Sequence, residues 1–412
     1  MPAVSITPIS GINESRKMFR VCLDDAPGQV VGVSDGQAVR ALVDDLLSSH
    51  TGVTRWGRPA GARHLSTTAR RRTGRGASSP TPVGGTHSVI DFKDQVAIVT
   101  GAGRGLGRLY ALELARRGAA VVVNDLGGTM HGEGSDASVA DQVVEEITQG
   151  GGRAVASYDS VDSPEGGQSI VDAAVDAFGR VDAVVSNAGI FNSIPFDQLT
   201  ADDWRRMLSV HLDGGFYLSQ PAFKVMAKQK SGRFVFISSS AGNFGQPMEA
   251  HYAAAKTGLV GLSNVIAIEG AEHGILSNTV LPTGFSRMVT ETVGDEKFLA
   301  ESGFMRAIRA ELVVPLVVFL ASRACESTHR NYSACAGRYA RVFVGLSEGW
   351  LADAETQPTA DDILAHLDAI SATEKFIVPD SIVDEVLEVC DRRGISPMPD
   401  NAEVAFPESA KK

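Results

Sequence analysis

The sequence has few cysteines, and none of them is spaced for a metal site or a redox pair. The 412 residues include four, which are Cys22, Cys325, Cys335 and Cys390. The short Cys-x-x-Cys spacings that bind zinc or exchange disulfides are missing. We therefore expect reduced thiols, no bound metal and a cytoplasmic location.

Long hydrophobic runs are also missing. The longest apolar run, Leu312–Ala321, is interrupted by Pro315 and is far shorter than the roughly 20 residues that cross a bilayer. The chain does not open with a charged segment followed by an apolar one, and it ends in Ala-Lys-Lys rather than the peroxisomal signal Ser-Lys-Leu. The sequence thus predicts no membrane span, no secretion signal and no peroxisomal signal of that kind.

Positive charge is in deficit. The chain has 38 Lys and Arg against 49 Asp and Glu, which gives a formal net charge of −11. Phosphate backbones repel such a chain as a whole, so nucleic acid is excluded as a main partner. The apolar fraction of 43% and the charged fraction of 21% are ordinary for a globular protein, and the length allows one large domain or two smaller ones.

Residues 1–90 differ in composition from the rest of the chain. Between Thr51 and Ile90 there are seven arginines and no acidic residue or lysine, and Ser, Thr, Gly and Pro fill much of the segment. Such a segment buries too little apolar surface to offset its ordering entropy, so we predict a disordered extension over residues 1–90. Within it, the pattern of residues 19–49 allows a short strand and a helix at Gln37–Leu47.

Functional interpretations of this extension stay open. The arginines could bind nucleic acid or another acidic surface. An organelle transit peptide is a second interpretation, although such peptides are poor in acids and this segment contains Asp24, Asp25, Asp44 and Asp45. A dispensable extension is the third, and the sequence alone does not choose among them.

The stretch from Gln95 to Asp125 predicts a dinucleotide-binding βαβ unit. A β-branched apolar run at Val96–Val99 suits a buried strand, and Thr100–Gly107 (TGAGRGLG) is a glycine-rich turn. Apolar residues then recur at helical spacing until Gly118, and a second buried strand ends just before Asp125. Glycines let the backbone approach a pyrophosphate at the positive end of the helix, and the acid has the offset expected for the ribose 2′-hydroxyl.

Strands and helices alternate through the rest of residues 91–350. Strands are expected at 153–158, 183–186, 233–238, 275–281 and 341–345, and helices at 139–147, 170–178, 204–230, 252–269 and 311–322. This alternation predicts an α/β fold of the Rossmann type, a doubly wound seven-stranded parallel sheet with helices on both faces. Residues 351–412 are expected to form an acidic C-terminal tail with helices at 360–370 and 381–393.

A second group of polar residues predicts proton chemistry. Ser238, Ser239 and Ser240 end a predicted strand, where open parallel sheets bind ligands. Tyr252 and Lys256 lie four apart and share one face of the next helix. An ammonium group and a nicotinamide cation both favour the phenolate, so we expect the pKa of Tyr252 to be lowered from its ordinary value near 10. A serine hydroxyl would hold the substrate oxygen while hydride leaves or reaches its carbon.

These motifs resemble those of the short-chain dehydrogenase/reductase family. The matching residues are Thr100-Gly101-x-x-x-Gly105-x-Gly107, Asn187-Ala188-Gly189, Ser239 and Tyr252-x-x-x-Lys256. The resemblance implies that Ser239, 13 residues before the tyrosine, is catalytic, that Tyr252 is the general acid/base, and that Lys256 binds the nicotinamide ribose and lowers the tyrosine pKa. It implies cofactor contacts at Gly101, Arg104, Gly105, Leu106, Gly107, Asp125, Asp159, Val161, Asn187, Ala188, Gly189, Tyr252 and Lys256.

Residues 92–350 are similar to one subgroup in particular, the dehydrogenase domain of peroxisomal multifunctional enzyme type 2, also called 17β-hydroxysteroid dehydrogenase type 4. The segments that carry this similarity are Asn124–Gly128, Tyr158–Val161, Val210–Leu212 and Ser286–Met288. The resemblance implies oxidation of (3R)-3-hydroxyacyl-CoA with NAD, or turnover of a steroid. The segment Asn243–Ala250 departs from the subgroup beside the expected substrate pocket.

His211 is a candidate catalytic residue with two open interpretations. Most of the family places Asn at this position, where it holds a water in the proton relay, whereas the subgroup also has His. A histidine can relay protons at neutral pH. A buried structural imidazole explains the residue equally well.

Two residues bear on the choice between NAD and NADP. Asp125 would repel a 2′-phosphate, which carries about −1.5 to −2 charges. Arg104 favours NADP, since NADP-dependent relatives often have arginine there. We expect NAD, because the acid lies nearest the 2′-hydroxyl.

The polar, glycine-containing segment Thr283–Ala307 is predicted to be a mobile lid over substrate and nicotinamide. Its apolar inner face would come from Phe285, Met288, Phe298, Phe304 and Met305.

Together these features predict an NAD-dependent oxidoreductase that transfers hydride between the nicotinamide and a secondary alcohol or ketone, such as a 3-hydroxyacyl-CoA or a steroid-like lipid. An NADPH-dependent 3-oxoacyl reductase is the nearest alternative. A non-catalytic dinucleotide-sensing protein, which uses the arginine-rich segment to bind a partner, is an alternative of another class. The family resemblance also implies a homodimer or homotetramer formed through the helices that hold Trp204–Lys230 and Tyr252–Glu269.

Overall fold

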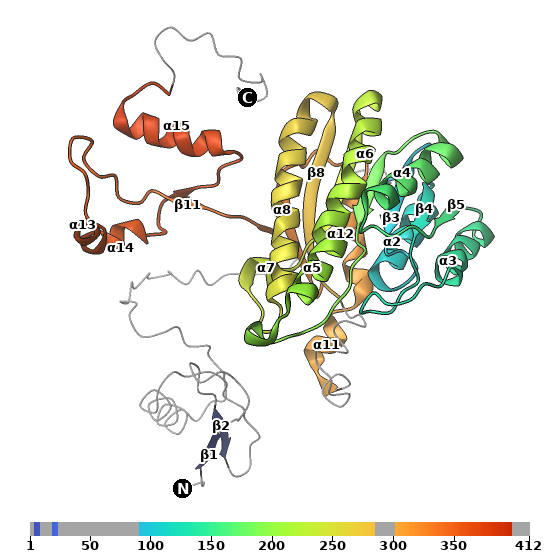
Figure 1. Ribbon diagram of the computed structural model, residues 1–412, viewed down its shortest axis with the longest axis horizontal. Coiled ribbons are helices and arrows are strands. Elements are labelled where there is room, and N and C mark those ends of the chain that lie inside the picture. The colour runs from blue at the N-terminus through green and yellow to red at the C-terminus, as the bar shows by residue number, and fades with distance from the viewer. Residues whose placement is uncertain (1–3, 9–18, 24–89, 285–300, 398–412) are drawn as a thin grey trace, which may run out of the picture. The chain divides into compact units, whose positions relative to one another are not determined.

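The computed structural model describes residues 4–8, 19–23, 90–284 and 301–397, and the chain divides into two compact units, residues 1–84 and 85–412 (Figure 1). In the first unit, strand β1 (Val4–Pro8) pairs antiparallel with β2 (Phe19–Leu23). The strand allowed by the pattern after Phe19 is therefore β2. The helix predicted at Gln37–Leu47, and most of the segment predicted to be disordered, lie outside the described residues.

An eight-stranded sheet runs through the second unit (Figure 1). Its order is β10-β9-β8-β7-β6-β3-β4-β5, and every pair of neighbours is parallel except β9 and β10. The strands are β3 (Val96–Thr100), β4 (Ala120–Asn124), β5 (Arg153–Ser157), β6 (Ala183–Ser186), β7 (Gly232–Ile237), β8 (Ile275–Thr283), β9 (Arg330–Cys335) and β10 (Arg338–Val342). The chain winds outward from β3 in both directions, so the predicted doubly wound fold is confirmed.

Two apolar cores pack on opposite faces of this sheet because successive strand residues point to opposite sides. Ile98 belongs to the core that contains helices α4, α6 and α8, and its neighbour Val99 belongs to the core that contains α2, α3 and α12. Both strand residues are fully buried. The six helices are α2 (Gly105–Arg116), α3 (Ser138–Gln149), α4 (Pro164–Phe178), α6 (Gly214–Gln229), α8 (Ala250–Gly270) and α12 (Val314–Ala321).

The structure corrects two predicted elements. The helix expected over 204–230 is three pieces, α5 (Ala201–Leu208), a π-helical turn η2 (Ser209–Asp213) and α6. The strand expected at 341–345 is not the seventh parallel strand, because β9 already fills that place and turns back through Ala336 and Gly337, both at positive φ, into the antiparallel β10. The sequence of β9, RNYSAC, has no apolar run that would have predicted a strand.

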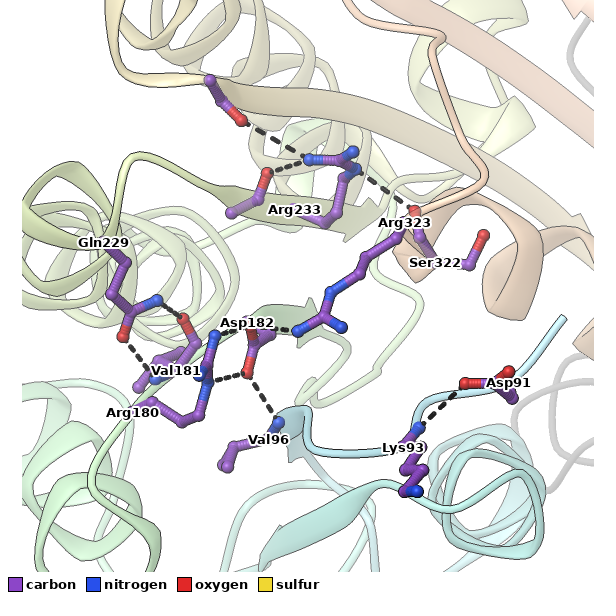
Figure 2. A network of polar contacts seen from close by, with 12 residues as sticks. Asp91, Lys93, Val96, Arg180, Val181, Asp182, Gln229, Arg233, Ser322 and Arg323 are labelled. Carbon is purple, nitrogen blue, oxygen red and sulfur yellow. Dashed lines mark hydrogen bonds and ion pairs between the residues drawn. The ribbon is translucent and has the colours of Figure 1, made fainter.

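A polar network fastens the amino ends of the central strands (Figure 2). Asp182, just before β6, is 4% exposed, and its carboxylate accepts hydrogen bonds from the backbone N–H of Val96 at 2.9 Å and from Nε and Nη2 of Arg180 at 2.7 Å each. The Arg323 guanidinium lies 3.7 Å from the same carboxylate. Nearby, the side-chain amide of Gln229 bonds both the N–H and the C=O of Val181. The network therefore joins the start of β3 to β6 and to the segment after α12.

The C-terminal part of the described chain contains short elements. Strands β11 (Leu346–Ser347) and β12 (Phe376–Ile377) pair antiparallel, and the helices are α13 (Ala360–Ala365), α14 (Leu367–Ile370) and α15 (Ile382–Arg393). Within the described ranges, none of the helices has both the length and the apolar character needed to cross a bilayer.

Candidate active site

A cavity of about 760 Å³ opens where the parallel strands end, next to β3, from which the sheet winds in both directions. Ligands bind open α/β sheets at this kind of position. The cavity brings together all fifteen predicted site residues, which are Gly101, Arg104, Gly105, Leu106, Gly107, Asp125, Asp159, Val161, Asn187, Ala188, Gly189, His211, Ser239, Tyr252 and Lys256.

The glycine turn after β3 is shaped for a close backbone approach. Gly101 and Gly105 have φ angles of +62° and +53°. A Cβ on Gly107 would lie 2.1 Å from the carbonyl oxygen of Gly101, so no larger residue fits. The Asn187 amide donates to the same carbonyl at 3.2 Å and to that of Thr100 at 2.9 Å, which closes the turn against β6.

Helix α2 begins at this turn without a capping side chain or an acidic residue in its first turn. The backbone N–H groups of its first turn therefore remain available to an anionic ligand, as expected for a pyrophosphate site. Together with the space that Gly107 leaves, this fits a dinucleotide.

Asp125 stands at the end of β4 with both carboxylate oxygens hydrogen-bonded. Gly103 N–H donates to one oxygen at 2.8 Å and Gly127 N–H donates to the other at 2.7 Å. These bonds fix the negative charge at the wall of the cavity. Arg104 donates from its guanidinium to the carbonyl oxygen of Gly128 at 3.1 Å, so the two residues on which the cofactor choice depends are both held in place.

The predicted adenine contacts lie beyond β5. Asn124 donates from its side chain to the carbonyl oxygen of Asp159 at 2.9 Å, which ties this segment to β4. Val161 is buried and lines the cavity.

The structure separates the three serines after β7. Ser238 is buried, and its hydroxyl donates to the carbonyl oxygen of Lys256 at 2.6 Å, so this hydroxyl is not available to donate to a ligand. Ser239 is the N-cap of α7 (Ser240–Phe244), accepts a hydrogen bond from Ala241 N–H at 3.1 Å, and also hydrogen-bonds Tyr252. Among the three, Ser239 is therefore the one that hydrogen-bonds the tyrosine.

Burial dominates the charge states of Tyr252 and Lys256. It raises the pKa of Tyr252 to about 12, although the hydrogen bond with Ser239 acts in the lowering direction. It lowers the pKa of Lys256 to about 7, and the ammonium donates to the Ile237 carbonyl oxygen at 2.7 Å, 5.6 Å from the Tyr252 ring centre. The lowered tyrosine pKa predicted from the lysine is thus not found in the protein alone, because desolvation outweighs the lowering effect of the hydrogen bond with Ser239.

His211 lies in the π-helical turn η2 and is 2% exposed. Its Nε2 is 2.7 Å from the carbonyl oxygen of Ile190 and 3.2 Å from the Ile190 nitrogen, and its Nδ1 has no hydrogen-bond partner among the described residues. Burial holds the pKa of His211 well below 6.5, so the ring is neutral. This ring and that of Phe191 each pack edge-on against Tyr252 with ring centres 5.3 Å apart.

Some site residues were missed from the sequence. Phe191 orients the tyrosine, and Glu249 lines the cavity one helical turn before it. The spacing of Glu249 and Tyr252, three residues apart on α8, was the available signal. Of the predicted lid residues, Phe304 and Met305 line the cavity, whereas Phe285, Met288 and Phe298 lie outside the described residues.

Comparison with known proteins gives consistent relatives. Residues 95–297 match the family described as short chain dehydrogenase. The chain is 40% identical over 317 residues to peroxisomal multifunctional enzyme type 2 of Mus musculus, and this match covers 75% of the chain but only 42% of the mouse protein. It is 40% identical over 274 residues to a putative short-chain type dehydrogenase/reductase of Mycobacterium tuberculosis, of which it covers 93%.

Among solved structures, the full-length peroxisomal multifunctional enzyme type 2 of Drosophila melanogaster superimposes with a TM-score of 0.60 and 30% identity, over 74% of this chain and 50% of that one. The chain therefore spans half or less of the length of the mouse and Drosophila multifunctional enzymes.

Proposed function

The chain belongs to the short-chain dehydrogenase/reductase family of NAD(P)-dependent oxidoreductases that act on CH–OH groups, and we propose that it uses NAD to interconvert a secondary alcohol and a ketone. We propose that the substrate is a 3-hydroxyacyl-CoA or a steroid-like lipid. One observation supports this proposal above all: Ser239, Tyr252 and Lys256 line the same cavity as the glycine turn and Asp125.

The proposed chemistry divides between the cofactor and the side chains. When bound, the dinucleotide supplies a nicotinamide ring that accepts or donates hydride. Ser239 holds the substrate oxygen by a hydrogen bond, and Tyr252 exchanges a proton with that oxygen. With a pKa of about 12, the phenol is protonated at neutral pH, the form that donates a proton to a ketone. Alcohol oxidation needs the phenolate, which the protonated Lys256 stabilises.

The preference for NAD rests on the fixed charge of Asp125. Two backbone hydrogen bonds hold the Asp125 carboxylate in place, so its charge would stay close to a 2′-phosphate. Arg104 is the feature that favours the alternative, an NADPH-dependent 3-oxoacyl reductase, but its guanidinium is bonded to the Gly128 carbonyl oxygen.

The substrate proposal draws on the cavity wall and on the relatives. Apolar side chains line part of the cavity, among them Ile190, Phe304, Met305 and Phe191, which packs on Tyr252. Such a wall suits a lipid chain or a steroid ring system. The similarity to multifunctional enzymes type 2 supports the acyl-CoA choice.

We further propose that residues 91–350 form the catalytic domain, with residues 1–90 an extension and residues 351–412 a tail. We expect a homodimer or homotetramer through α5, α6 and α8, whose exposed apolar residues include Trp204, Phe216, Val265 and Ile268. A monomer by light scattering would contradict this.

For location we propose the cytoplasm. The peroxisome is the alternative that the names of the relatives suggest, and fluorescence microscopy of the tagged full chain separates the two.

The test is reduction of NAD and of NADP by the purified protein with 3-hydroxyacyl-CoAs, hydroxysteroids and simple secondary alcohols. We expect turnover of a hydroxyacyl-CoA or hydroxysteroid with NAD, and a loss of at least about 100-fold in Tyr252→Phe. The matched control is Tyr110→Phe, since the Tyr110 hydroxyl is buried in α2 without a hydrogen-bond partner among the described residues. Unchanged biological activity of the Tyr252→Phe variant would favour a non-catalytic dinucleotide-sensing protein instead.

A further inference from the structure

Glu249 is a buried carboxyl group that the proposed chemistry does not use. It lines the cavity, only 5% of the residue is exposed, and within the described part of the chain its carboxyl group makes no hydrogen bond or ion pair. A carboxyl group that lines a cavity beside reacting groups and has no protein partner is free to hydrogen-bond a ligand atom.

The position of Glu249 brings it close to the reacting groups. It is the N-cap residue of α8, and Tyr252 and Lys256 follow it by three and seven residues, so the three side chains form one stripe along the helix. All three line the same cavity. A negative charge on Glu249 also raises the pKa of Tyr252, which places the carboxyl within electrostatic reach of the phenol.

The segment that carries Glu249 is held in place. The carbonyl oxygen of Met248 accepts a hydrogen bond from Ile194 N–H at 2.8 Å, and His251 Nε2 lies 2.7 Å from the Asn192 side-chain oxygen. These contacts on both sides fix the glutamate against the loop after β6, where a substrate would meet Tyr252.

The protonated form of Glu249 is the one that suits this place. Burying an unpaired carboxylate is costly, and burial raises the pKa of Glu249 accordingly. A neutral Glu249 also does not repel the negative charge that forms on Tyr252 when it becomes a phenolate. The other titratable or charged groups that line the cavity among the described residues are Lys256, His211, Arg104, Asp125, Asp159 and Asp162.

We propose that Glu249 is a specificity-determining residue that, as a neutral carboxylic acid, donates a hydrogen bond to a substrate carbonyl group whose carbon lies two bonds from the carbinol carbon. A 3-hydroxyacyl group has its carbonyl at that place, whereas a simple secondary alcohol has none. The inference thus deepens the proposed function and rests on it. Glutamine at this position would keep the donor, and alanine would remove it.

The test compares Glu249→Gln and Glu249→Ala with wild type on a 3-hydroxyacyl-CoA, on ethyl 3-hydroxybutyrate and on 2-pentanol. We expect the alanine variant to lose about 10- to 100-fold in kcat/KM on the two carbonyl compounds, mostly through KM, and less than about 3-fold on 2-pentanol. The glutamine variant should stay within about 3-fold on all three. Glu269→Gln, an exposed glutamate on the same helix, is the control.

A pH series gives a second readout. As pH rises, wild type should lose kcat/KM on the carbonyl compounds relative to Glu249→Gln, because only the wild-type acid ionises. Equal losses of the alanine variant on all substrates, or no loss on any, would overturn the proposal. Inactivity of wild type on every acyl-CoA, with the expected contrast between ethyl 3-hydroxybutyrate and 2-pentanol, would reject the acyl-CoA substrate and still support the role of Glu249.

Discussion

At the scale of single residues, the proposed preference for NAD over NADP depends on the negative charge of Asp125. Asn at this position would remove the negative charge and keep one of the two backbone hydrogen bonds, because its amide nitrogen cannot accept the other. We expect Asp125→Asn to shift the ratio of kcat/KM for NADP over NAD upward by at least about 10-fold, because the 2′-phosphate is no longer repelled. Initial rates with both cofactors measure the ratio. Glu133→Gln, exposed on the loop after β4, should leave it unchanged.

Lys256 makes folding stability depend on pH at the residue scale. Its pKa is 10.5 when unfolded and about 7 in the folded protein, so between these values the unfolded chain binds more protons. The lysine therefore destabilises the fold increasingly as pH falls from 10.5 towards about 7. We expect the unfolding free energy of wild type relative to Lys256→Met to rise as pH is raised through this window.

Urea titrations at several pH values measure this difference. Lys228→Met, at an exposed position of α6, should give a difference from wild type that does not change with pH in the same window. A flat difference for Lys256→Met would show that its ammonium is not desolvated in the folded protein.

At the scale of elements, the π-helical turn η2 aims His211 inward. Both of the hydrogen-bond contacts at Nε2 go to the main chain of Ile190, and a Cβ on Gly189 would lie 2.2 Å from the His211 ring, so the imidazole packs tightly on the loop after β6. Of the two interpretations that the sequence left open, this bonding favours the structural imidazole.

We therefore expect His211→Asn to lower the unfolding free energy by about 1–3 kcal/mol while kcat falls by less than about 10-fold. Urea unfolding and steady-state rates measure the two effects. A fall in kcat of about 100-fold or more, with a changed solvent isotope effect and unchanged stability, would instead identify a proton relay. His273→Asn, near the end of α8, is the matched substitution away from the cavity.

The elements also show what a sequence can predict. The first βαβ unit, from β3 to β4, was predictable for two reasons. Buried parallel strands are continuous apolar runs, and the glycines between β3 and α2 allow the close backbone approach that a dinucleotide needs. β9 was not, since its polar residues are satisfied by neighbours across the chain, such as Thr279 with Asn331. The break of the long helix at η2 has no local signal such as an internal proline at that point.

The candidate site was predictable in its membership but less so in its electrostatics. Helical spacing placed Tyr252 and Lys256 on one face, the family resemblance selected Ser239, and all three residues line one cavity. The direction of the tyrosine pKa depends on how deeply the ring is desolvated, which spacing does not reveal. Glu249 was overlooked because a glutamate before a helix is usually an exposed residue.

At the scale of the whole molecule, Asp182 joins segments that are far apart in the chain. Its carboxylate holds the backbone of Val96 and the guanidinium groups of Arg180 and Arg323 (Figure 2). We expect Asp182→Asn to lower the unfolding free energy by about 2–4 kcal/mol, because both arginines lose their partner and the neutral side chain accepts fewer hydrogen bonds.

Urea unfolding measures this loss against Asp172→Asn, since Asp172 is an exposed acid of α4 whose carboxylate accepts a hydrogen bond from Gln168. Cofactor affinity at low denaturant should stay within about 3-fold of wild type in Asp182→Asn, since the network lies at the opposite ends of the strands from the cavity. A loss of affinity without a loss of stability would contradict this assignment.

The separation of these two ends bears on how the protein can be redesigned. Strands β3 and β4, which run between them, are each five residues long, or about 16 Å, so the polar network around Asp182 and the substrate wall share few neighbours. Directed evolution confined to residues 190–195 and 243–250 should yield libraries in which most clones still fold. Selection would then act on new alcohol specificities rather than on rescue of a damaged scaffold.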